Sequence, residues 1–502
     1  MKSRNPNSGC DDFRTAQRLS RREALHIGGL GGLGLTLPQL LASNADAAAE
    51  SPRTFGRAKR VIMLFLHGGH PQQETFDPKP DGPTAVRGEF GAIATSVAGV
   101  RFSEVLPRMA TRMHRLSIVR SMSHANPNHV QACLPANTGH KHPPGEKRGD
   151  FPPSDTDFPP FGAVLDHLRS RIRKNSGGRP PEFSRILLRR ENSEVGGDAR
   201  GNSHEFPYET LPTWVRVGPL MRRNNGTVLH GQLPGFLGAK HMHFAVDQKL
   251  TGKDVRVEAV QPADDLTSIR LSARKDLLRQ FDSQRRFIEQ SAAAQRFDTF
   301  YQKAFSLLSS SATRKAFDLT AESPKTRERY GDTEFGQRCL LARRLAEAGV
   351  PMVNVSYCHT PRGSWDTHSR NFTQMKRSLA PTLDTAFSAL LDDLADRRLL
   401  DDTLVIVNAE FGRTPKINRN AGRDHWPWVY SLALAGAAIR PGVVHGASDN
   451  SAAYPTAHPH DPADMAATIY HLLGVDPKTT LYDKLRRPHH LVIGKAIGAI
   501  LG

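Results

Sequence analysis

Seven carboxylate and imidazole side chains lie just outside short apolar runs of this 502-residue chain, in four groups. The groups are Glu74 with Asp77, Asp366 with His368, Glu410 alone, and Asp424 with His425. Carboxylate oxygen and imidazole nitrogen together suit Zn, Mn or a similar divalent ion. Two such ions can clamp the attacking and leaving oxygens of a phosphoryl or sulfuryl transfer. These seven residues are therefore the predicted metal ligands, and ester hydrolysis is the predicted chemistry.

Arg413 lies three residues after Glu410 in the segment 401–415, which reads DDTLVIVNAEFGRTP. A guanidinium fork can hold a tetrahedral anion, so Arg413 is a candidate for both catalysis and substrate binding. A simpler role is open for each residue taken alone. Glu410 could be an exposed loop residue that caps a helix, and Asp77 could hold a turn before Pro78. The matching positions of the four groups favour a shared site.

The segment 123–129, SHANPNH, follows a predicted strand at 116–120. Its histidines and asparagines must find polar partners, and His124 and Asn128 are candidates for substrate binding. Asn128 could also cap a helix that runs through Ala136.

The elements that must position these groups are short, apolar and rich in β-branched residues. Strands are predicted at 61–66, 116–120, 350–356, 403–407 and 430–435. Such runs are typical of strands buried on both faces of a parallel sheet. Helices are predicted at 128–136, 161–173, 334–348, 371–398 and 463–473. The fold class is therefore α/β, with a mostly parallel sheet sandwiched by helices, and ligands are expected at the carboxyl ends of the strands.

The first 49 residues predict an export signal rather than part of the fold. Residues 20–25 form a twin-arginine pattern, residues 27–41 are apolar and glycine-rich, and residues 45–49 offer cleavage points of the A-x-A kind. We expect export by the twin-arginine route, to the periplasm or the cell exterior. A chance arginine pair before a short helix is the alternative. No transmembrane segment is expected apart from this leader, and whether it is cleaved or kept as an anchor stays open.

Residues 58–500 predict one domain with a loop-rich insertion at 140–160 and 189–260 and a helical insertion at 264–320. The formal net charge of +18 favours an acidic partner, such as an anionic ester or a polysaccharide. The charge is dispersed, and no block of Lys and Arg carries interleaved aromatic residues, so nucleic acid is not the expected partner. The three cysteines outside the leader make no disulfide framework.

Several ordered segments resemble those of one family of exported proteins. They include ETFDPKP, SMSHANPNH, PPFGAVL, WDTHSRNF, DDTLVIVNAEFGRTPKIN, GRDHWP and ATIYHLLGVDP. Over roughly residues 58–500 the chain is similar to the domain-of-unknown-function family 1501, which is regarded as an outlying branch of the alkaline phosphatase and sulfatase superfamily. The resemblance implies an alkaline phosphatase/sulfatase-like core with metal sites at the carboxyl edge of the sheet.

Residue by residue, the resemblance implies the following roles. Glu410 and Phe411 stand where sulfatases carry the Asp and His of an Asp-His-Gly metal motif, so one ligand is replaced. His425 matches a later metal-binding His, and Asp366 and His368 resemble the Asp and His of the other metal site.

The Cys or Ser nucleophile of sulfatases falls near His129, which is therefore the candidate catalytic nucleophile. Three functions stay open. The first is a metal-dependent hydrolase of phosphate or sulfate esters. The second is a non-catalytic, sulfatase-like binding protein for an anionic glycan or a partner protein, which the replaced nucleophile and Phe411 favour. The third is a metal enzyme of another reaction class on the same scaffold. The four groups of ligand-type residues place the hydrolase first.

Overall fold

The computed structural model describes residues 53–142, 149–175, 211–252, 255–260, 310–358 and 364–502. From Thr54 onward the chain forms one compact unit. The predicted leader at 1–49 and most of the predicted helical insertion at 264–320 lie outside the described residues. Among the residues that are described, none of the helices is both long and apolar enough to cross a membrane.

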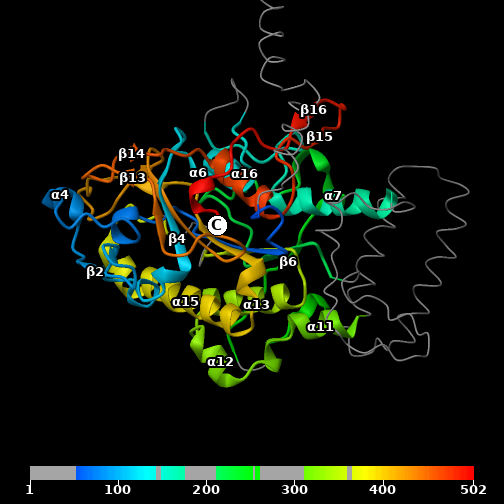
Figure 1. Cartoon of the computed structure of the whole chain (residues 1–502), viewed down its shortest axis with the longest axis horizontal. Helices are drawn as coiled ribbons and strands as arrows, with labels where there is room; N and C mark the ends of the chain where they lie inside the picture. The colour runs from blue at the N-terminus through cyan, green and yellow to red at the C-terminus, as the bar shows by residue number, and fades with distance from the viewer. Residues whose placement is uncertain (1–52, 143–148, 176–210, 253–254, 261–309, 359–363) are drawn as a thin grey trace, which may run out of the picture. The chain divides into compact units, whose positions relative to one another are not determined.

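Among the described residues, eight strands form the central sheet, in the order β12-β4-β11-β8-β1-β7-β5-β6. Figure 1 labels β4 and β6 of this sheet. The bounds of the strands are β1 (Arg60–Phe65), β4 (Leu116–Met122), β5 (Trp214–Val217), β6 (Phe244–Val246), β7 (Met352–Ser356), β8 (Thr403–Asn408), β11 (Tyr430–Ala435) and β12 (Val443–His445). All neighbouring pairs are parallel except the two pairs that contain β11. The predicted mostly parallel sheet is confirmed, and β11 alone runs against the other strands.

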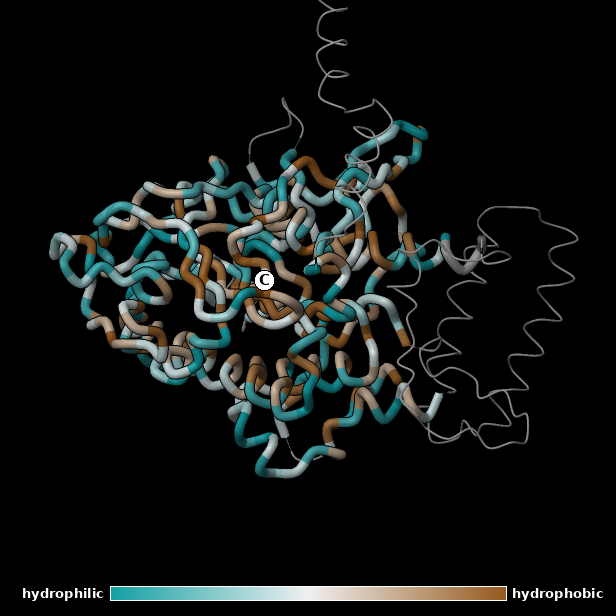
Figure 2. The backbone as a smooth tube through the Cα atoms, in the orientation of Figure 1, coloured by the Kyte–Doolittle hydropathy of each residue, from teal (hydrophilic) through white to brown (hydrophobic). Residues whose placement is uncertain are grey.

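The side chains of the central strands alternate between two hydrophobic cores. On β1, Ile62 and Leu64 face one core, and Val61 and Met63 face the other. All four side chains are fully buried, as expected for a strand covered on both faces. The hydrophobic stretches lie among the central strands, whereas many of the outer turns are hydrophilic (Figure 2).

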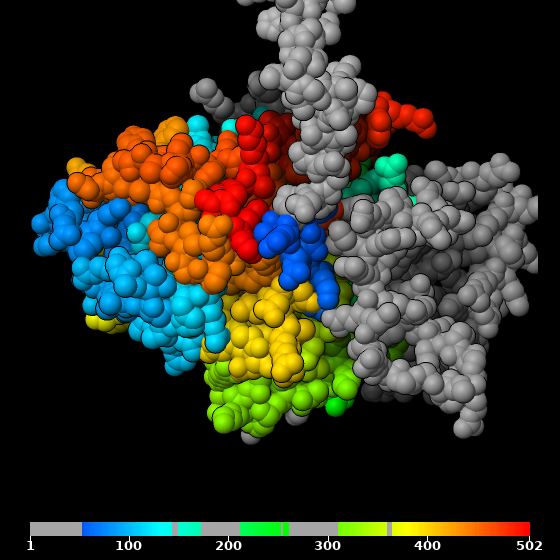
Figure 3. All heavy atoms as spheres, in the orientation of Figure 1, coloured from blue at the N-terminus to red at the C-terminus, as the bar shows by residue number. Residues whose placement is uncertain are grey.

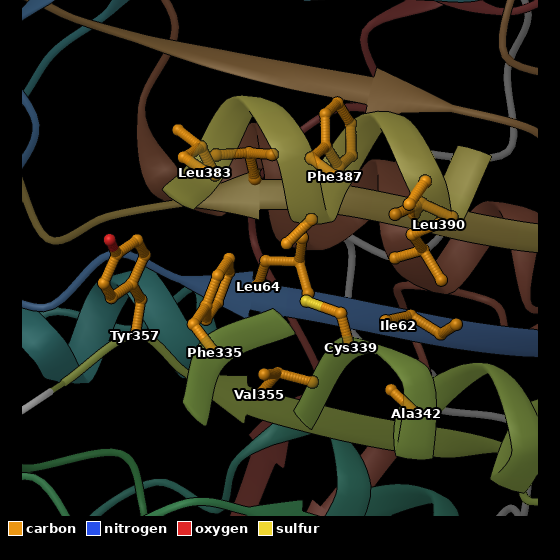
Figure 4. Close-up of a cluster of buried hydrophobic side chains, with 14 of the residues drawn as sticks. Ile62, Leu64, Phe335, Cys339, Ala342, Val355, Tyr357, Leu383, Phe387 and Leu390 are labelled. Carbon is orange, nitrogen blue, oxygen red and sulfur yellow. The ribbon is translucent and has the colours of Figure 1, made fainter. Parts of the chain in front are cut away.

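Helices α13 (Glu334–Glu347) and α15 (Ala380–Asp396) cover the face that carries Ile62 and Leu64. Their side chains converge on those two residues, with Phe335 on α13 and Phe387 on α15 among them (Figure 4). The opposite face is covered by α6 (His129–Thr138), α7 (Phe161–Asn175) and α16 (Pro462–Leu472).

The remaining elements are short. The helical ones are η1 (Gln72–Glu74), α4 (Thr84–Arg87), α5 (Pro107–Ala110), η2 (Met113–Arg115), η4 (Gly235–Leu237), η5 (Ala239–His241), η6 (Glu258–Val260), α11 (Ser311–Phe317), η7 (Leu319–Ala321), α12 (Pro324–Arg329), α14 (Asn371–Gln374), η8 (Met375–Leu379), η9 (Leu400–Asp402) and η10 (Gly498–Ile500). The strands are β2 (Ala92–Ala94), β3 (Arg101–Ser103), β9 (Gly412–Arg413), β10 (His425–Trp426), β13 (Ala447–Ser448), β14 (Pro455–Ala457), β15 (Thr480–Tyr482) and β16 (Pro488–His490).

The helix predicted at 371–398 is interrupted by a π-helical turn, η8, between α14 and α15. Pro381 lies in the first turn of α15. Proline has no N–H to donate, and its ring collides with the carbonyl four residues earlier, which widens the preceding turn.

The loop-rich insertion predicted at 189–260 differs from the structure. Residues 189–210 lie outside the described part, but the following segment contributes β5 and β6 to the sheet beside β7. Strands of four and three residues are too short to give a periodic pattern, and this explains the difference.

The start of the described chain packs against the end of α16. The N–H of Gly56 donates to the carbonyl of His471 at 3.0 Å, and that of Ala58 donates to the carbonyl of Leu472 at 2.7 Å. In the space-filling view the residues that precede β1 and the C-terminal residues lie on the same face (Figure 3).

His243 makes the stability of this fold depend on pH. Burial and the charge of the neighbouring Arg216 guanidinium together lower the pKa of His243 to about 3, and Nε of Arg216 donates to Nε2 of His243 at 2.9 Å. The unfolded chain binds a proton to this ring below about pH 6.5 and the folded chain does not, so the free energy of unfolding falls as pH drops from 6.5 toward 3. We expect His243→Gln, which still accepts from Arg216 but does not titrate, to remove roughly 1–2 kcal/mol of the difference between pH 7 and pH 5. Urea unfolding at the two pH values measures this difference. Equal pH dependence in the two proteins would contradict the prediction.

Candidate metal centre

Segments that are distant in the sequence meet at one edge of the sheet. β1, β4, β7 and β8 point in the same direction, so the residues that follow them lie at the same edge. β11 runs against β8, and β10, which carries His425, precedes β11 and therefore reaches this edge as well. His129 follows β4 and Glu410 follows β8, and these two side chains are in contact although they are 281 positions apart.

Asp366 is the centre of the cluster. Its Oδ1 lies 3.2 Å from Nε2 of His129, 3.0 Å from Nε2 of His368 and 3.1 Å from Nε2 of His425. The Nε2 atoms of His368 and His425 are 2.9 Å apart. Nη2 of Arg413 donates to the same oxygen of Asp366 at 2.7 Å. Three imidazole nitrogens and one carboxylate oxygen thus face one point.

Hydrogen bonds behind the rings determine which nitrogen carries the proton. Nδ1 of His425 is 2.7 Å from the carbonyl oxygen of Pro127, and Nδ1 of His368 is 2.6 Å from Oδ1 of Asp424. Carbonyl and carboxylate oxygens accept hydrogen bonds, so each Nδ1 is the donor and each Nε2 of a neutral ring is a bare acceptor. These acceptors and Asp366 repel one another unless a proton or a metal cation lies between them. Metal-ligating histidines are oriented in this way in many sites.

The described residues include two groups of three metal-ligand-type residues, and His129 belongs to both. Within each group, the three ligand atoms lie within 4.8 Å of one another. We call His67, His129 and Glu410 the inner triad, and His129, Asp366 and His425 the outer triad. In the inner triad, Oε1 of Glu410 accepts a backbone N–H at 2.8 Å and lies 2.6 Å from Nδ1 of His129. A neutral imidazole has one lone pair, so His129 can serve one of the two triads at a time.

The polar atoms of the triads fit a divalent cation. Nε2 of His129 and Oε2 of Glu410 are buried and have no hydrogen-bond partner among the described residues. A buried polar atom left unpaired costs about 1–3 kcal/mol, which a bound cation would offset. Imidazole nitrogen combined with carboxylate oxygen is a donor set for Zn, Mn or Fe.

The charge states of these groups also suit cation binding. Burial would raise the pKa of Asp366, but the surrounding imidazoles of His129, His368 and His425 and the Arg413 guanidinium outweigh burial and hold that pKa well below its usual range. Burial would also raise the pKa of Glu410, but the hydrogen bond with His129 outweighs burial and lowers that pKa. Burial lowers the pKa of His425 to about 4, so the ring is neutral at pH 7. Ionised carboxylates and neutral imidazoles are the forms that ligate metals.

The outer triad is open to solvent on the side of His368. The side chains of His368 and Asp424 are 44% and 52% exposed, whereas His129 is 1% exposed. Phe411 closes the inner side, with its ring centroid 4.7 Å from that of His129 and 4.8 Å from that of His425. A substrate can therefore approach the outer triad from the side of His368.

The structure corrects the predicted substrate contact of Arg413. This side chain is fully buried, and its donors are used within the protein. Nε donates to the carbonyl of Gly69 at 3.0 Å, Nη1 to the carbonyl of Arg423 at 3.2 Å, and Nη2 to Asp366 and the carbonyl of Gly68. Arg413 therefore holds the strand ends and Asp366 in place with four of its N–H groups, from a fully buried position.

His124 and Asn128 hold backbone at the site. Nε2 of His124 donates to the carbonyl of Glu410 at 2.7 Å, and Nδ1 accepts from the N–H of Asn126 at 3.1 Å. Asn128 is the N-cap of α6, and its side chain accepts from the N–H of Gln131 at 3.3 Å, as predicted for a cap. The contacts of both side chains indicate a positioning role instead of the predicted contact with substrate.

Glu74 and Asp77 lie outside both triads. Glu74 is buried and bound by Arg423, with Nη2 2.6 Å from Oε1. Asp77 accepts from Ser448, and its Oδ1 lies 3.1 Å from Nζ of Lys79. A cation already neutralises each carboxylate, and the structure does not bring these two residues together with the triads, so their metal-ligand role stays a prediction. Asp424 is also outside the triads.

Two residues of the site were missing from the predicted set. His67 lies two residues after the end of β1, and the HGG sequence at that strand end was the signal that could have found it. Its Nδ1 is 3.5 Å from Sγ of Cys358, and burial lowers the pKa of His67 to about 4. Arg223 has Nη1 4.0 Å from Oδ2 of Asp366. It follows no predicted strand, so no sequence pattern pointed to it.

The solved structures that the chain resembles include the following three. A protein in the alkaline phosphatase superfamily from Vibrio parahaemolyticus is 11% identical, with a TM-score of 0.37 over 90% of this chain and 72% of that chain. A sulfatase from Pseudoalteromonas sp. is 11% identical, with a TM-score of 0.35 over 87% and 70%. A phosphonate monoester hydrolase from Silicibacter pomeroyi is 12% identical, with a TM-score of 0.30 over 88% and 76%.

The comparison with family models agrees with the ordered sequence motifs. No curated protein matches the chain. The model described as "Protein of unknown function (DUF1501)" matches residues 58–501, which include every residue of both triads. The chain therefore belongs to the DUF1501 family.

Proposed function

We propose that this protein is a metal-dependent hydrolase of phosphate or sulfate esters. The outer triad carries the proposal, because Nε2 of His129, Oδ1 of Asp366 and Nε2 of His425 face one point that is open to solvent on one side. A divalent ion held there would polarise an ester oxygen and lower the pKa of a water molecule. His368 lies on the open side of the triad.

Each ligand is held from behind by another group. The carbonyl of Pro127 fixes the ring of His425, and Glu410 fixes Nδ1 of His129, so that both Nε2 atoms point to Asp366. Contacts of this kind typically contribute roughly 10- to 100-fold to metal affinity. The buried Arg413 fixes the Asp366 oxygen itself.

His368 is placed to give a proton to the leaving group of the ester. Its hydrogen bond to Asp366 raises its pKa, and Asp424 raises it further by holding Nδ1 at 2.6 Å. The ring is the most exposed of the three imidazoles around Asp366. Positioned acids of this kind contribute roughly 10²- to 10⁴-fold to the rate of hydrolysis.

We expect His368→Gln to retain the metal and to lower the rate of hydrolysis about 100-fold. The loss should be larger for phenyl phosphate than for 4-nitrophenyl phosphate, since the poorer leaving group needs the proton more. Elemental analysis of the full chain measures bound Zn, Mn and Fe, and initial rates on the two esters, or on the matching sulfates, measure hydrolysis. Loss of the metal in this variant, or an equal loss of rate on both esters, would contradict the proton-donor role.

The rival function is a sulfatase-like binding protein for an anionic glycan or a partner protein. Phe411 favours this binding function, because its apolar ring packs against His129 and His425 and offers no ligand atom to a metal. A chain that binds a sulfated polysaccharide equally well with and without chelator, and hydrolyses neither class of ester, would replace the hydrolase with this function. The twin-arginine pattern at 20–25 supports export, which we include in the proposal.

A further inference from the structure

An ester of phosphate or sulfate brings negative charge to the outer triad, so its binding calls for a cationic donor on the open side. Arg413 cannot supply it, because the side chain is fully buried and its donors are used within the protein. His368 already uses Nδ1 on Asp424. A further cation beside the outer triad is therefore expected to bind the anion.

Arg223 lies beside the outer triad, next to Asp366. Its side chain is 27% exposed, and Nη1 is 4.0 Å from Oδ2 of Asp366, the carboxylate at the centre of the cluster. Nε makes a long hydrogen bond of 3.4 Å to Oδ2 of Asp150. Among the residues that the structure describes, Nη2 has no hydrogen-bond partner. The guanidinium thus keeps donors for an anion that binds beside Asp366.

A tight turn fixes the backbone of Arg223. Its N–H donates to the carbonyl of Thr227 at 2.8 Å, and its carbonyl accepts from the N–H of Gly226 at 2.9 Å. Gly226 has a φ of +87°, which residues other than glycine rarely adopt. The side chain therefore starts from a backbone of defined position.

Asp150 connects this turn to the start of α6. It accepts from Arg223, from Asn225 at 3.4 Å and from Nδ2 of Asn128 at 3.0 Å. Asn128 directly precedes His129, a member of both triads. The contacts Asn128–Asp150–Arg223 therefore connect the guanidinium to the residue that precedes His129.

We propose that Arg223 binds the anionic group of the substrate, a phosphate or sulfate, beside Asp366 of the outer triad. The inference rests on the proposed ester chemistry. Nη1 and Nη2 form a planar fork of the kind that binds two oxygens of such an anion. Asp150 is a positioning residue in this arrangement, because it contacts Arg223 and not the reacting atoms.

The test is binding of inorganic phosphate and sulfate to the full chain loaded with zinc, measured by titration calorimetry. Arg223→Ala should weaken anion binding at least about tenfold, and Arg223→Lys should restore part of it, because charge is kept and the fork is lost. Arg222→Ala is the matched control, since Arg222 is the exposed neighbour on the same turn and donates to the carbonyl of Gly226. It should bind both anions like the wild type. Zinc content and the thermal midpoint are measured on the same samples.

The outcomes separate this inference from the proposed function. Unchanged anion binding in Arg223→Ala, with zinc retained, would overturn the role of Arg223 and leave the metal centre standing. An equal loss of anion binding in Arg222→Ala would also overturn the role of Arg223, because the loss would then follow from removing any positive charge on this turn. A wild-type chain that takes up no zinc would overturn the proposed function instead.

Discussion

Asp366→Asn is expected to abolish metal binding, with bound zinc in the full chain falling from about one equivalent to less than about one tenth. Oδ1 of Asp366 is the atom that Nε2 of His129 and Nε2 of His425 approach within 3.2 Å. The amide has no negative charge to balance a cation. Hydrolysis of either class of ester should disappear with the metal, since the variant removes the ligand that the other two face.

The change to asparagine also removes the negative charge that pairs with Arg413. The thermal midpoint therefore checks that the variant still folds. His425→Ala is a second variant that removes a ligand without touching the Asp366–Arg413 pair, and it should lose the metal as well. Asp77→Asn is the matched control, because Asp77 is a buried carboxylate that pairs with Lys79 outside both triads. Wild-type zinc content in Asp366→Asn and His425→Ala would refute the outer triad as a metal centre.

Arg423→Met is expected to lower the free energy of unfolding by about 3–5 kcal/mol. Arg423 is fully buried, and Nε and Nη2 bind both carboxylate oxygens of Glu74 at 2.6 to 3.1 Å. The same guanidinium donates to the carbonyls of Val86 at 2.6 Å and Thr414 at 2.9 Å. Removing it leaves a buried carboxylate without its cation and several carbonyls without donors.

The pH dependence of the variant follows from Glu74. Burial raises the pKa of Glu74, and the Arg423 guanidinium offsets part of that shift. Without Arg423 the raised pKa is no longer offset, so the stability of the variant should be higher at low pH and lost as pH rises through that pKa. Urea unfolding at pH 5 and pH 8 measures this, with a smaller loss expected at pH 5.

Arg397→Met is the matched control for the buried pair. Arg397 also binds two acids, Asp393 and Glu347, but its side chain is 36% exposed, so its loss should cost no more than about 1 kcal/mol. Glu74→Gln should keep its full zinc content, because Glu74 lies outside both triads. A loss in Arg423→Met no larger than that in Arg397→Met would show that the buried pair does not stabilise the fold.

Five strands and the edge at which the chemistry lies could be predicted from the sequence. The runs 403–407 and 430–435 correspond to β8 and β11 because an apolar, β-branched run is a local signal of a buried strand. Residues that follow parallel strands must share one edge, so Asp366 and Glu410 were placed near each other without coordinates. The short strands β5 and β6 escaped prediction because three or four residues carry no period.

Within the candidate site, local patterns identified residue types but not their partners. Glu74 and Asp366 look alike in the sequence, since each is a carboxylate beside a predicted strand. Only the tertiary structure pairs Glu74 with the buried Arg423 and surrounds Asp366 with three imidazoles. Electrostatic pairing depends on which charged groups lie within a few ångströms of each other, and this distance is unrelated to their separation in the sequence.

The sequence by itself determined the α/β sheet, the family and most of the ligand-type residues of the outer triad, because these depend on local apolar runs and ordered motifs. The tertiary structure decided that Arg413 is buried, that His67 belongs to the inner triad and that Arg223 lies next to Asp366. These outcomes depend on which loops meet at the sheet edge and on which donors are already used there. A local sequence pattern predicts neither the meeting of these loops nor the use of these donors, because both follow from contacts between segments far apart in the chain.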